Sequence, residues 1–595
     1  MMFKRILDTL GPNNTEKAKH QEQHKVDCHP ETRKSLLRDI DQWLSPPALH
    51  NHSTSERLWW ITGPPAMGKS AVAITVAKRL EPRQRDIPKS SVDGPLLVLG
   101  AQYFVNHNLD SSNPHNIFPT IAAQLAKLDH YARVSLHDEI APMIEHRTTY
   151  PLLELSDYQA DLLFVRPLKA ICESMECKNR VLVIVLDGID ELRVNKDLDV
   201  DPVHDFTKIL CTVSAKLPQN VRVLVLSRPE HSICKHLRSP STSIRTSSFP
   251  MAELKEDVDT FLRTNIRKMV ESVDHCQDRA DWPSEDQIDI IRITAQGHVA
   301  IAKAAILLIQ TTYRYQGMPR ANKMFEMIKQ VKAGNLYHFY EKLLRDVVLE
   351  TTPPLDQEGC TFVLACISIL QNGTIGIISA LFKAKYPKND DFDTSHFFSS
   401  IRSIVIQNIN PIDNQTIPSP HKSLVDYLTS EETPEPFRVA VGHWRNELAE
   451  LCFTIMQQSL HFNMGEITTS HSRLSFDEFK QTEILSKKPR LFKYTADQPI
   501  SVDLSVAYAC DTFHVHLGQA TLGDKRTLEM VNILVKELLL FWMEVISLAR
   551  YHGMIMGETE PLVFEVTEFH PMLHALSLLV KVSSIYFYFR VLTLL

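Results

Sequence analysis

Several features that would assign this 595-residue chain to a specialised class are missing from its sequence. The ten cysteines include no CxxC pair, so the spacing typical of a zinc site or a redox pair is absent, and most lie in apolar segments, which indicates reduced, buried thiols. Lys and Arg are scattered and the formal net charge is −7, so there is no basic footprint for nucleic acid or for an acidic membrane surface. We therefore expect protein partners.

The patterns of an export signal and of a membrane span are also missing. The start, MMFKRILDTLGPNN, has an apolar stretch too short for a signal peptide. The apolar segment from Pro571 to Leu595 is interrupted by Lys581 and Arg590, and a charge at the centre of a bilayer costs about 2.5–3.5 kcal/mol. The sequence argues against a membrane anchor and, with the reduced thiols, favours a cytoplasmic protein.

The length exceeds what one hydrophobic core supports, which is about 250–300 residues, and the composition is that of a globular protein. Breaks in the pattern, such as the polar, Pro-bearing stretches at 351–354 and 431–436, mark candidate boundaries. The expected parts are a flexible N-terminal tail at 1–27, a nucleotide-binding domain at 28–250, a helical domain at 251–350, a compact domain at 351–430, a helical domain at 431–555 and an apolar tail at 556–595.

Continuous apolar runs alternate with helical patterns in the first half of the chain. Runs that are apolar throughout, alternating with helices, predict a parallel sheet covered by helices on both faces. After about residue 250 the strand signals stop and the pattern becomes helical. The predicted strands are 58–62, 96–105, 181–186 and 221–226, and the predicted helices of the same region are 69–80, 116–128, 157–175 and 205–216.

The stretch GPPAMGKS, which begins at Gly63, fits the phosphate-loop pattern G-x-x-x-x-G-K-[ST] between a predicted strand and a predicted helix. Because the chain has only 18 glycines, a chance match has a probability of about one in a hundred. Gly63 and Gly68 let the backbone approach an anion, and the N–H groups from Met67 to Ser70 would point at it. Lys69 would reach the β- and γ-phosphates, and the Ser70 hydroxyl would bind Mg²⁺. A Gly/Pro-rich turn is the alternative interpretation.

Two further predicted strands end in polar side chains. VLVIVLDGIDEL delivers Asp187 to the carboxyl end of a buried strand, where ligands bind in open α/β sheets, with Asp190 and Glu191 close behind. VRVLVLSRPE brings Arg228 to the same edge, where a guanidinium could pair with a terminal phosphate. An acidic turn and a solvated loop arginine are the alternatives.

Together, these blocks resemble the NACHT domains of STAND-class signal-transduction NTPases, in particular the fungal family related to the N-terminal NTPase of nephrocystin-3. CHPETRKSLLRDIDQWL, NIFPTIAAQLA, LLFVRPLKAI, DGIDEL and SRPE occur in that family's order. The resemblance implies an α/β P-loop NTPase followed by helical, winged-helix and further helical domains.

The resemblance continues into the second half of the chain. HKSLVDYL resembles the HxSFxDFL block of the winged-helix region, which makes His421 a candidate ADP sensor; a capping or packing histidine is the alternative. VAYACDTFHVHL and LLLFWMEVISLA resemble the helices that precede a C-terminal repeat array. Two departures stand out. Gly297–His298–Val299 replaces the Gly-x-Pro found near the adenine, and the array itself is absent, as in a short member or a truncated gene model.

The family implies a molecular switch that ADP or GDP keeps closed and that ATP or GTP opens, after which protomers self-associate and slow hydrolysis resets the state. Asp187 and Ser70 would hold Mg²⁺, Asp190 or Glu191 would orient the attacking water, and Arg228 would sense the γ-phosphate. Two other functions remain open: a P-loop enzyme such as a small-molecule kinase, and a scaffold whose NTPase fold has lost its activity.

Overall fold

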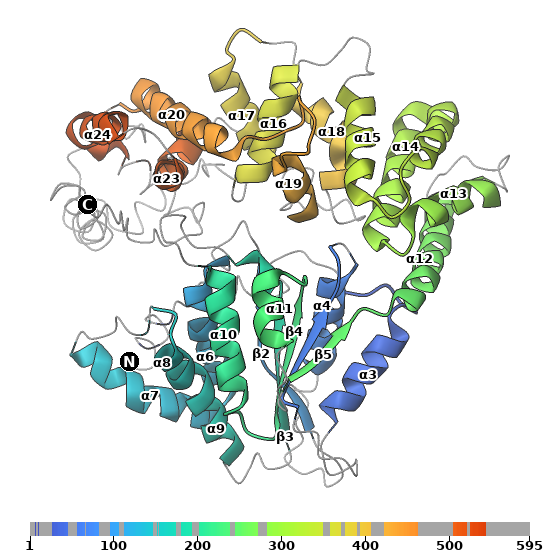
Figure 1. Cartoon of the computed structure of the whole chain (residues 1–595). Helices are drawn as coiled ribbons and strands as arrows, with labels where there is room; N and C mark the ends of the chain where they lie inside the picture. The colour runs from blue at the N-terminus through green and yellow to red at the C-terminus, as the bar shows by residue number, and fades with distance from the viewer. Residues whose placement is uncertain are drawn as a thin grey trace, which may run out of the picture. The chain divides into compact units, whose positions relative to one another are not determined.

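We analysed a computed structural model of the chain (Figure 1). Two compact units are found. The first comprises Met1–Val347 with Ile401–Pro411 and Pro418–Tyr427, and the second comprises the remainder. The structure describes residues 6, 10, 27–45, 56–65, 67–81, 96–105, 112–146, 152, 154–173, 180–192, 201–238, 244–271, 282–348, 357–370, 375–389, 393–405, 422–461, 504–520, 524–542 and 545.

A five-stranded parallel sheet is the centre of the first unit. Its strands lie in the order β2-β3-β4-β1-β5, so β4 is inserted between β1 and β3. Since all pairings are parallel, the carboxyl ends of the strands meet at one edge of the sheet. The strands are β1 (Leu58–Thr62), β2 (Leu96–Phe104), β3 (Arg180–Asp187), β4 (Val221–Ser227) and β5 (Ile244–Ser248).

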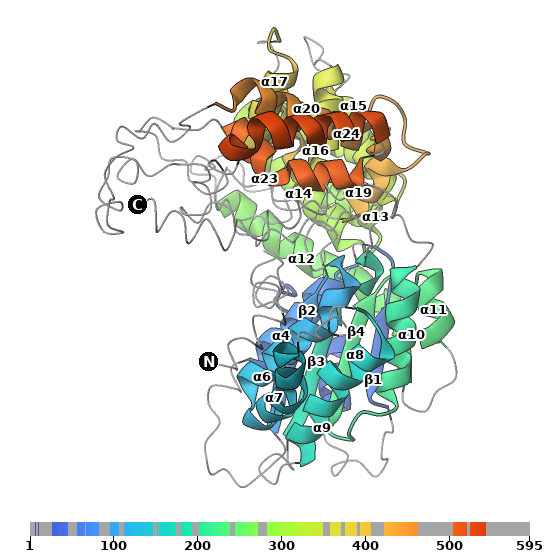
Figure 2. The same cartoon turned by 90° about the vertical axis from the view of Figure 1, so that its left-hand side faces the viewer.

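Side chains that alternate along the strands build two separate hydrophobic cores, one on each face of the sheet. Trp59 and Ile61 of β1 enter the core beneath α3 (Lys34–Leu44) and α4 (Lys69–Leu80). Leu58 and Trp60 enter the opposite core. The opposite face is covered by helices (Figures 1 and 2), namely α6 (Ile117–Leu128), α7 (His130–Glu145), α8 (Asp157–Ala160), the π-helical turn η5 (Asp161–Val165), α9 (Arg166–Glu173), α10 (Pro202–Ser214) and α11 (His231–Leu237).

The predicted parallel sheet with helices on both faces is confirmed, and the predicted bounds of its first strand and of the helix after it, 58–62 and 69–80, are those observed. The edge strand β5 has the polar, half-exposed sequence IRTSS, which lacks an apolar signal. Ile6 and Leu10 are buried in the core, although the polar composition of residues 1–27 predicts a tail with little to bury.

The rest of the first unit is helical wherever the structure describes it, as the sequence predicts. It consists of α12 (Met251–Glu271), α13 (Glu285–Ala295), α14 (Val299–Lys329), which is interrupted at Gly317, and α15 (Leu336–Val348). Ser284 and Gln287 form a reciprocal capping box that fixes the start of α13. The first part of α19 (Lys422–Thr429), up to Tyr427, also belongs to this unit.

The described part of the second unit is helical. Its elements include α16 (Gln357–Ile369), α17 (Ile375–Lys385), α20 (Val441–Ser459), α23 (Leu504–Gln519), α24 (Asp524–Ile533) and the π-helical turn η8 (Leu534–Leu538), while α18 (Thr394–Val405) is divided between the two units. Within 351–430, where a winged helix is expected, the described residues form helices and no strand. Residues 406–421 lie outside the described part, so the winged helix stays a prediction.

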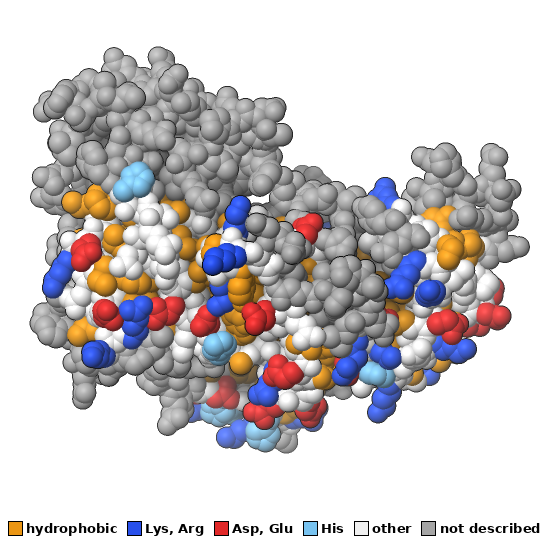
Figure 3. Space-filling model, turned by 90° about the horizontal axis from the view of Figure 1, so that it is seen from above, with side chains coloured by type: hydrophobic (Ala, Val, Ile, Leu, Met, Phe, Trp, Pro, Cys, Tyr) orange, Lys and Arg blue, Asp and Glu red, His pale blue; other side chains and the backbone are white. Residues whose placement is uncertain are grey.

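Membrane spans, the distribution of charge and the state of the cysteines can be compared with the expectations from the sequence. None of the described helices is long and apolar enough to cross a membrane, and the apolar segment at 571–595 lies outside the described residues. On the face shown in Figure 3, Lys and Arg are interspersed with Asp and Glu. The described cysteines are free thiols, of which Cys360, Cys366, Cys452 and Cys510 are buried.

Candidate functional site

The strand register brings the predicted site residues together at the carboxyl edge of the sheet. Thr62 of β1 pairs with Ser227 of β4, and Leu226 pairs with Asp187 of β3. The residues after these strand ends are therefore neighbours, with Arg228 between Gly63 and Asp187. The Gly63 N–H donates to Ser227 O at 3.4 Å, which continues the ladder into the loop.

The loop after β1 has the backbone of a phosphate-binding turn. Gly68 caps α4 with φ +89°, a left-handed conformation that favours glycine, and α4 begins at Lys69. Met67 is buried, while Ser70 and Lys69 are half-buried. The first N–H groups of α4 have no carbonyl partner within the helix, so this terminus suits an anion.

Lys69 folds back over the loop. Its Nζ donates to Gly63 O at 2.8 Å and to Pro64 O at 2.7 Å. Burial lowers its pKa to about 8, against the attraction of Asp190 and Asp187. An ammonium that is partly desolvated and held by two carbonyls gains from an incoming anion, because a phosphate would replace weak neutral acceptors with full charge.

The three acidic residues at the end of β3 differ in how far they are buried. Asp187 is 1% exposed, and Gly188 follows it with φ +80°, turning the chain into the short 3₁₀ helix η7 (Ile189–Glu191). Asp190 on that turn is also buried, whereas Glu191 is half-buried. Asp187, Asp190 and Glu191 all lie close enough to Lys69 to act on its charge.

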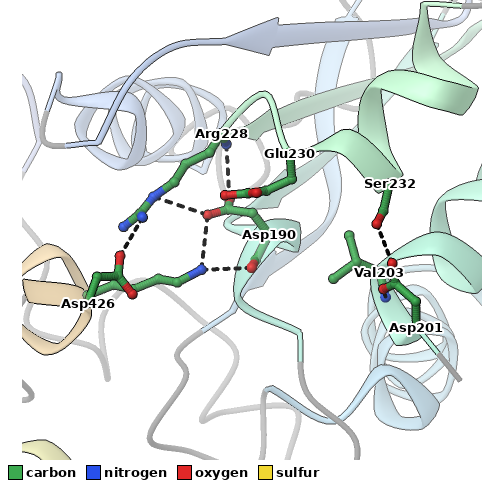
Figure 4. A pocket seen from close by; sticks show the side chains of 8 residues that line it. Asp190, Asp201, Val203, Arg228, Glu230, Ser232 and Asp426 are labelled. Carbon is green, nitrogen blue, oxygen red and sulfur yellow. Dashed lines mark hydrogen bonds and ion pairs between the residues drawn. The ribbon is translucent and has the colours of Figure 1, made fainter. Parts of the chain in front are cut away.

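Asp190 and Arg228 form the centre of an ionic network (Figure 4). Asp190 Oδ1 accepts the Arg228 backbone N–H at 3.1 Å, and Asp190 Oδ2 lies 3.4 Å from Arg228 Nε. The other end of the guanidinium binds Asp426 Oδ2 through Nη1 at 2.5 Å. Burial opposes the charge of Arg228, but the adjoining Asp426 and Asp190 outweigh it, so the pKa of Arg228 is raised.

Lys422 completes the network from α19. Its Nζ donates to Asp190 O at 2.7 Å and lies 3.4 Å from Asp190 Oδ2. Sequence reasoning missed Lys422 and Asp426, although they stand four residues apart in the HKSLVDYL block, on one face of a helix. They pair with Asp190 and Arg228, which lie about 200 residues earlier in the chain. A cavity of about 370 Å³ adjoins the network, lined by Asp190, Asp201, Val203, Arg228, Glu230, Ser232, Lys422 and Asp426.

His421, the predicted ADP sensor, immediately precedes Lys422 and lies outside the described residues. The helix after it is fixed within the first unit by buried contacts: Ser423 Oγ and Tyr340 Oη of α15 are 3.0 Å apart. The Tyr427 ring lies 5.8 Å from that of Tyr340.

A second cavity, of about 360 Å³, borders the phosphate loop at Pro65. His298, where the family pattern has the variable residue of Gly-x-Pro, lines it. Burial lowers the pKa of His298, so its imidazole is neutral at neutral pH. The lining comprises Pro65, His298, Lys332, Ala333, Gly334, Asn335, Leu336 and Tyr337.

The donor set fits Mg²⁺ bound jointly with phosphate. Among the described residues, no cluster of three or more His, Cys, Asp or Glu could hold a metal by itself. Asp187 is, however, a buried carboxylate at the same sheet edge as the Ser70 hydroxyl, and Mg²⁺ is usually held by one or two protein oxygens together with phosphate and water. The residues therefore suit a metal that arrives with its nucleotide.

Comparison with known proteins supports part of the resemblance stated above. The family model for the N-terminal part of nephrocystin 3 matches residues 32–228, the stretch that holds the phosphate loop, the acidic strand end and Arg228. No match is found among curated proteins. Solved structures that are similar include the ORC2 protein of Aeropyrum pernix with ADPNP and ADP, at 12% identity and a TM-score of 0.30, covering 68% of this chain and 95% of that chain. That superposition is too loose to support an argument. Residues 32–228 are thus similar to the nephrocystin 3 N-terminal family, on an α/β fold with a phosphate loop.

Proposed function

We propose that this chain is a nucleotide-dependent switch of the STAND class, with a NACHT-type NTPase as in the fungal nephrocystin-3-like proteins. The observation that carries the proposal is that Lys422 and Asp426 bind Asp190 and Arg228 at the edge of the sheet beside the phosphate loop. A segment remote in sequence thus contacts the residues that would meet the terminal phosphate. In the proposed switch these contacts would form in one state and be released in another, which is how a bound nucleotide could bias the two states.

In this proposal the phosphate loop binds a nucleoside di- or triphosphate. The amides at the start of α4 and the Lys69 ammonium would hold the phosphates. Ser70 and Asp187 would hold Mg²⁺, which supplies charge neutralisation at the phosphates when bound. The cavity beside Pro65 and His298 would take the base; we leave open whether that base is adenine or guanine.

The proposed closed state is the one in which α19 engages the NTPase. Asp190 already accepts the Arg228 N–H, and Lys422 is close to its other oxygen. A γ-phosphate would compete with Asp426 for the Arg228 guanidinium, because Arg pairs bidentately with phosphate oxygens. Release of Asp426 and Lys422 would then free Asp190 or Glu191 to orient a water for slow hydrolysis, and the freed segments would support self-association. His421 is proposed as an ADP contact at the start of α19.

A scaffold without nucleotide is the second candidate, and the same network favours it in one respect. Asp190, Arg228, Lys422 and Asp426 neutralise one another, and Lys69 binds its own loop. A permanently closed fold would need no more than this.

Nucleotide content separates the two candidates. The full chain is purified without added nucleotide and denatured, and the released small molecules are separated by chromatography. The switch predicts near-stoichiometric ADP or GDP, and its loss in Lys69→Ala. An empty protein whose melting temperature ignores added Mg-ATP and Mg-GTP would establish the scaffold, because ligand at about 100 times its dissociation constant stabilises a folded protein by about 2.7 kcal/mol.

A further inference from the structure

A buried arginine that is not among the predicted site residues binds the main chain of the phosphate loop. Arg33 precedes α3 and is 3% exposed. Its Nη2 donates to Met67 O of the loop at 2.6 Å, and its Nη1 donates to Asp257 Oδ2 of α12 at 2.7 Å. The guanidinium also lies over the Phe249 ring, 5.3 Å from the ring centre. Loop, helix and strand end are thus joined by one side chain.

Asp257 fixes the orientation of Arg33. Both of its carboxylate oxygens accept the Arg33 backbone N–H at 3.2 Å, so the same carboxylate binds the main chain and the side chain of Arg33. Arg33 itself has φ +56°, a left-handed backbone that a non-glycine residue adopts only when its surroundings hold it there. Burial lowers the pKa of Arg33 and raises that of Asp257, so each charge depends on the other.

The bond to Met67 O has a direct consequence for the amide that follows. The Met67–Gly68 peptide is trans, and in a trans peptide the C=O and the N–H point in opposite directions. Because Arg33 captures the carbonyl, the Gly68 N–H is directed away from Arg33.

We infer that Arg33 is a positioning residue of the phosphate loop: it binds the Met67 carbonyl on the side of the loop away from the phosphate and so presents the Gly68 N–H to a bound phosphate group. The inference rests on the proposed nucleotide binding and adds a residue to that site. Asp257 supports the role by keeping the guanidinium fork in place. A lysine could reach one of the two acceptors at a time but could not bridge them, because its ammonium is a point charge on a flexible stem.

The test measures phosphate affinity in the full chain. Tripolyphosphate and Mg-ATP are titrated by calorimetry, which gives the dissociation constant separately from the fraction of active protein. Arg33→Gln alone leaves Asp257 buried without its partner and threatens folding, so the main variant is Arg33→Gln with Asp257→Asn. Arg33→Lys tests rescue. Lys34→Gln is the matched control, because this neighbouring side chain carries the same charge and is 60% exposed.

The double variant is expected to bind both ligands about 10- to 100-fold more weakly, which is the range for a hydrogen bond to a charged group. The two ligands should lose the same factor, because the effect lies in the phosphate donors, and Arg33→Lys should fall between the double variant and the wild type. Lys34→Gln should stay within about twofold. Wild-type dissociation constants in a folded double variant would overturn the role of Arg33 alone. A wild-type chain that binds neither ligand would overturn the proposed function and this role with it.

Discussion

The Lys422 ammonium donates to the main-chain carbonyl of Asp190 at 2.7 Å, across 232 positions of sequence. Because Asp190 also accepts the Arg228 N–H, one acidic turn joins the end of β4 to the start of α19. The carboxylate of Asp426, one helical turn after Lys422, holds the far end of Arg228. In the proposed switch, this four-residue network is the latch that holds the start of α19 beside the phosphate loop.

Removal of the latch is expected to speed nucleotide release. Lys422→Met with Asp426→Asn deletes both charges that α19 contributes. Hydrogen bonds to charged groups contribute about 1.5–3 kcal/mol each when well shielded, and these are only partly shielded, so we expect dissociation of a fluorescent ADP analogue to rise about tenfold. Stopped-flow fluorescence measures the rate.

The control for the latch variant is Arg263→Gln, which removes one charge from a side chain that is 51% exposed. Its dissociation rate should match that of the wild type. An unchanged rate in the folded Lys422→Met, Asp426→Asn chain would show that α19 does not restrain the nucleotide.

Phosphate affinity is expected to fall at alkaline pH through Lys69. Its pKa is about 8 in the free protein, below the ordinary 10.5, and a bound phosphate favours the charged form. Binding above pH 8 therefore takes up a proton, and the dissociation constant should rise about tenfold for each pH unit above that value. Titration of tripolyphosphate between pH 7 and pH 9.5 measures this.

Stability of the free protein changes in the opposite direction. Because the folded pKa of Lys69 lies below its ordinary value, its contribution to stability is present above pH 10.5 and is lost as the pH falls toward 8.

Lys303 on α14 is the control for the affinity measurement, because burial also lowers its pKa to about 8. The alkaline loss of affinity should persist in Lys303→Met. If it disappears in that variant, the group that titrates is Lys303 and not Lys69.

Much of the site could be predicted from the sequence because its parts follow local patterns. The glycine spacing around Lys69 is a backbone requirement of the loop, and six apolar residues before Asp187 predict a buried strand that ends in a carboxylate. Parallel pairing then brings the strand ends to one edge. These steps need no knowledge of distant contacts.

The partners of these residues could not be predicted in the same way. Arg33 and Asp257 are 224 positions apart, and neither stands in a pattern that names the other. Lys422 and Asp426 do share a helix face, yet that spacing equally predicts a solvated i,i+4 pair. Strand β5 was missed because an edge strand with one exposed side needs no apolar run.

Removal of Mg²⁺ is expected to expose the role of Asp187. Asp187→Asn keeps the size of the side chain and deletes the charge of a carboxylate that is 1% exposed. If Asp187 holds the metal, Mg²⁺ should tighten ATP binding in the wild type by about tenfold or more and should have little effect in the variant, since a full negative charge is the main protein ligand lost. Calorimetry in Mg²⁺ and in EDTA measures both. Equal Mg²⁺ dependence in the two proteins would remove Asp187 from the metal site.

Gly188 should not tolerate a side chain, because of its backbone conformation and the space around it, whether or not a ligand is bound. Its φ is +80°, and a Cβ there would lie 3.3 Å from Val105 O. Forcing an L-residue into this conformation costs about 1–2 kcal/mol, so Gly188→Ala should lower the midpoint of chemical unfolding of the first unit. Tryptophan fluorescence follows the transition, and Trp59 and Trp60, which lie in the two cores of the sheet, contribute to that signal. Gly442→Ala is the matched control, because a Cβ at that position meets nothing within 4 Å. If both variants unfold like the wild type, the turn after Asp187 does not need glycine, and the hydrogen bonds and ion pairs around Asp190 suffice to place it against Arg228.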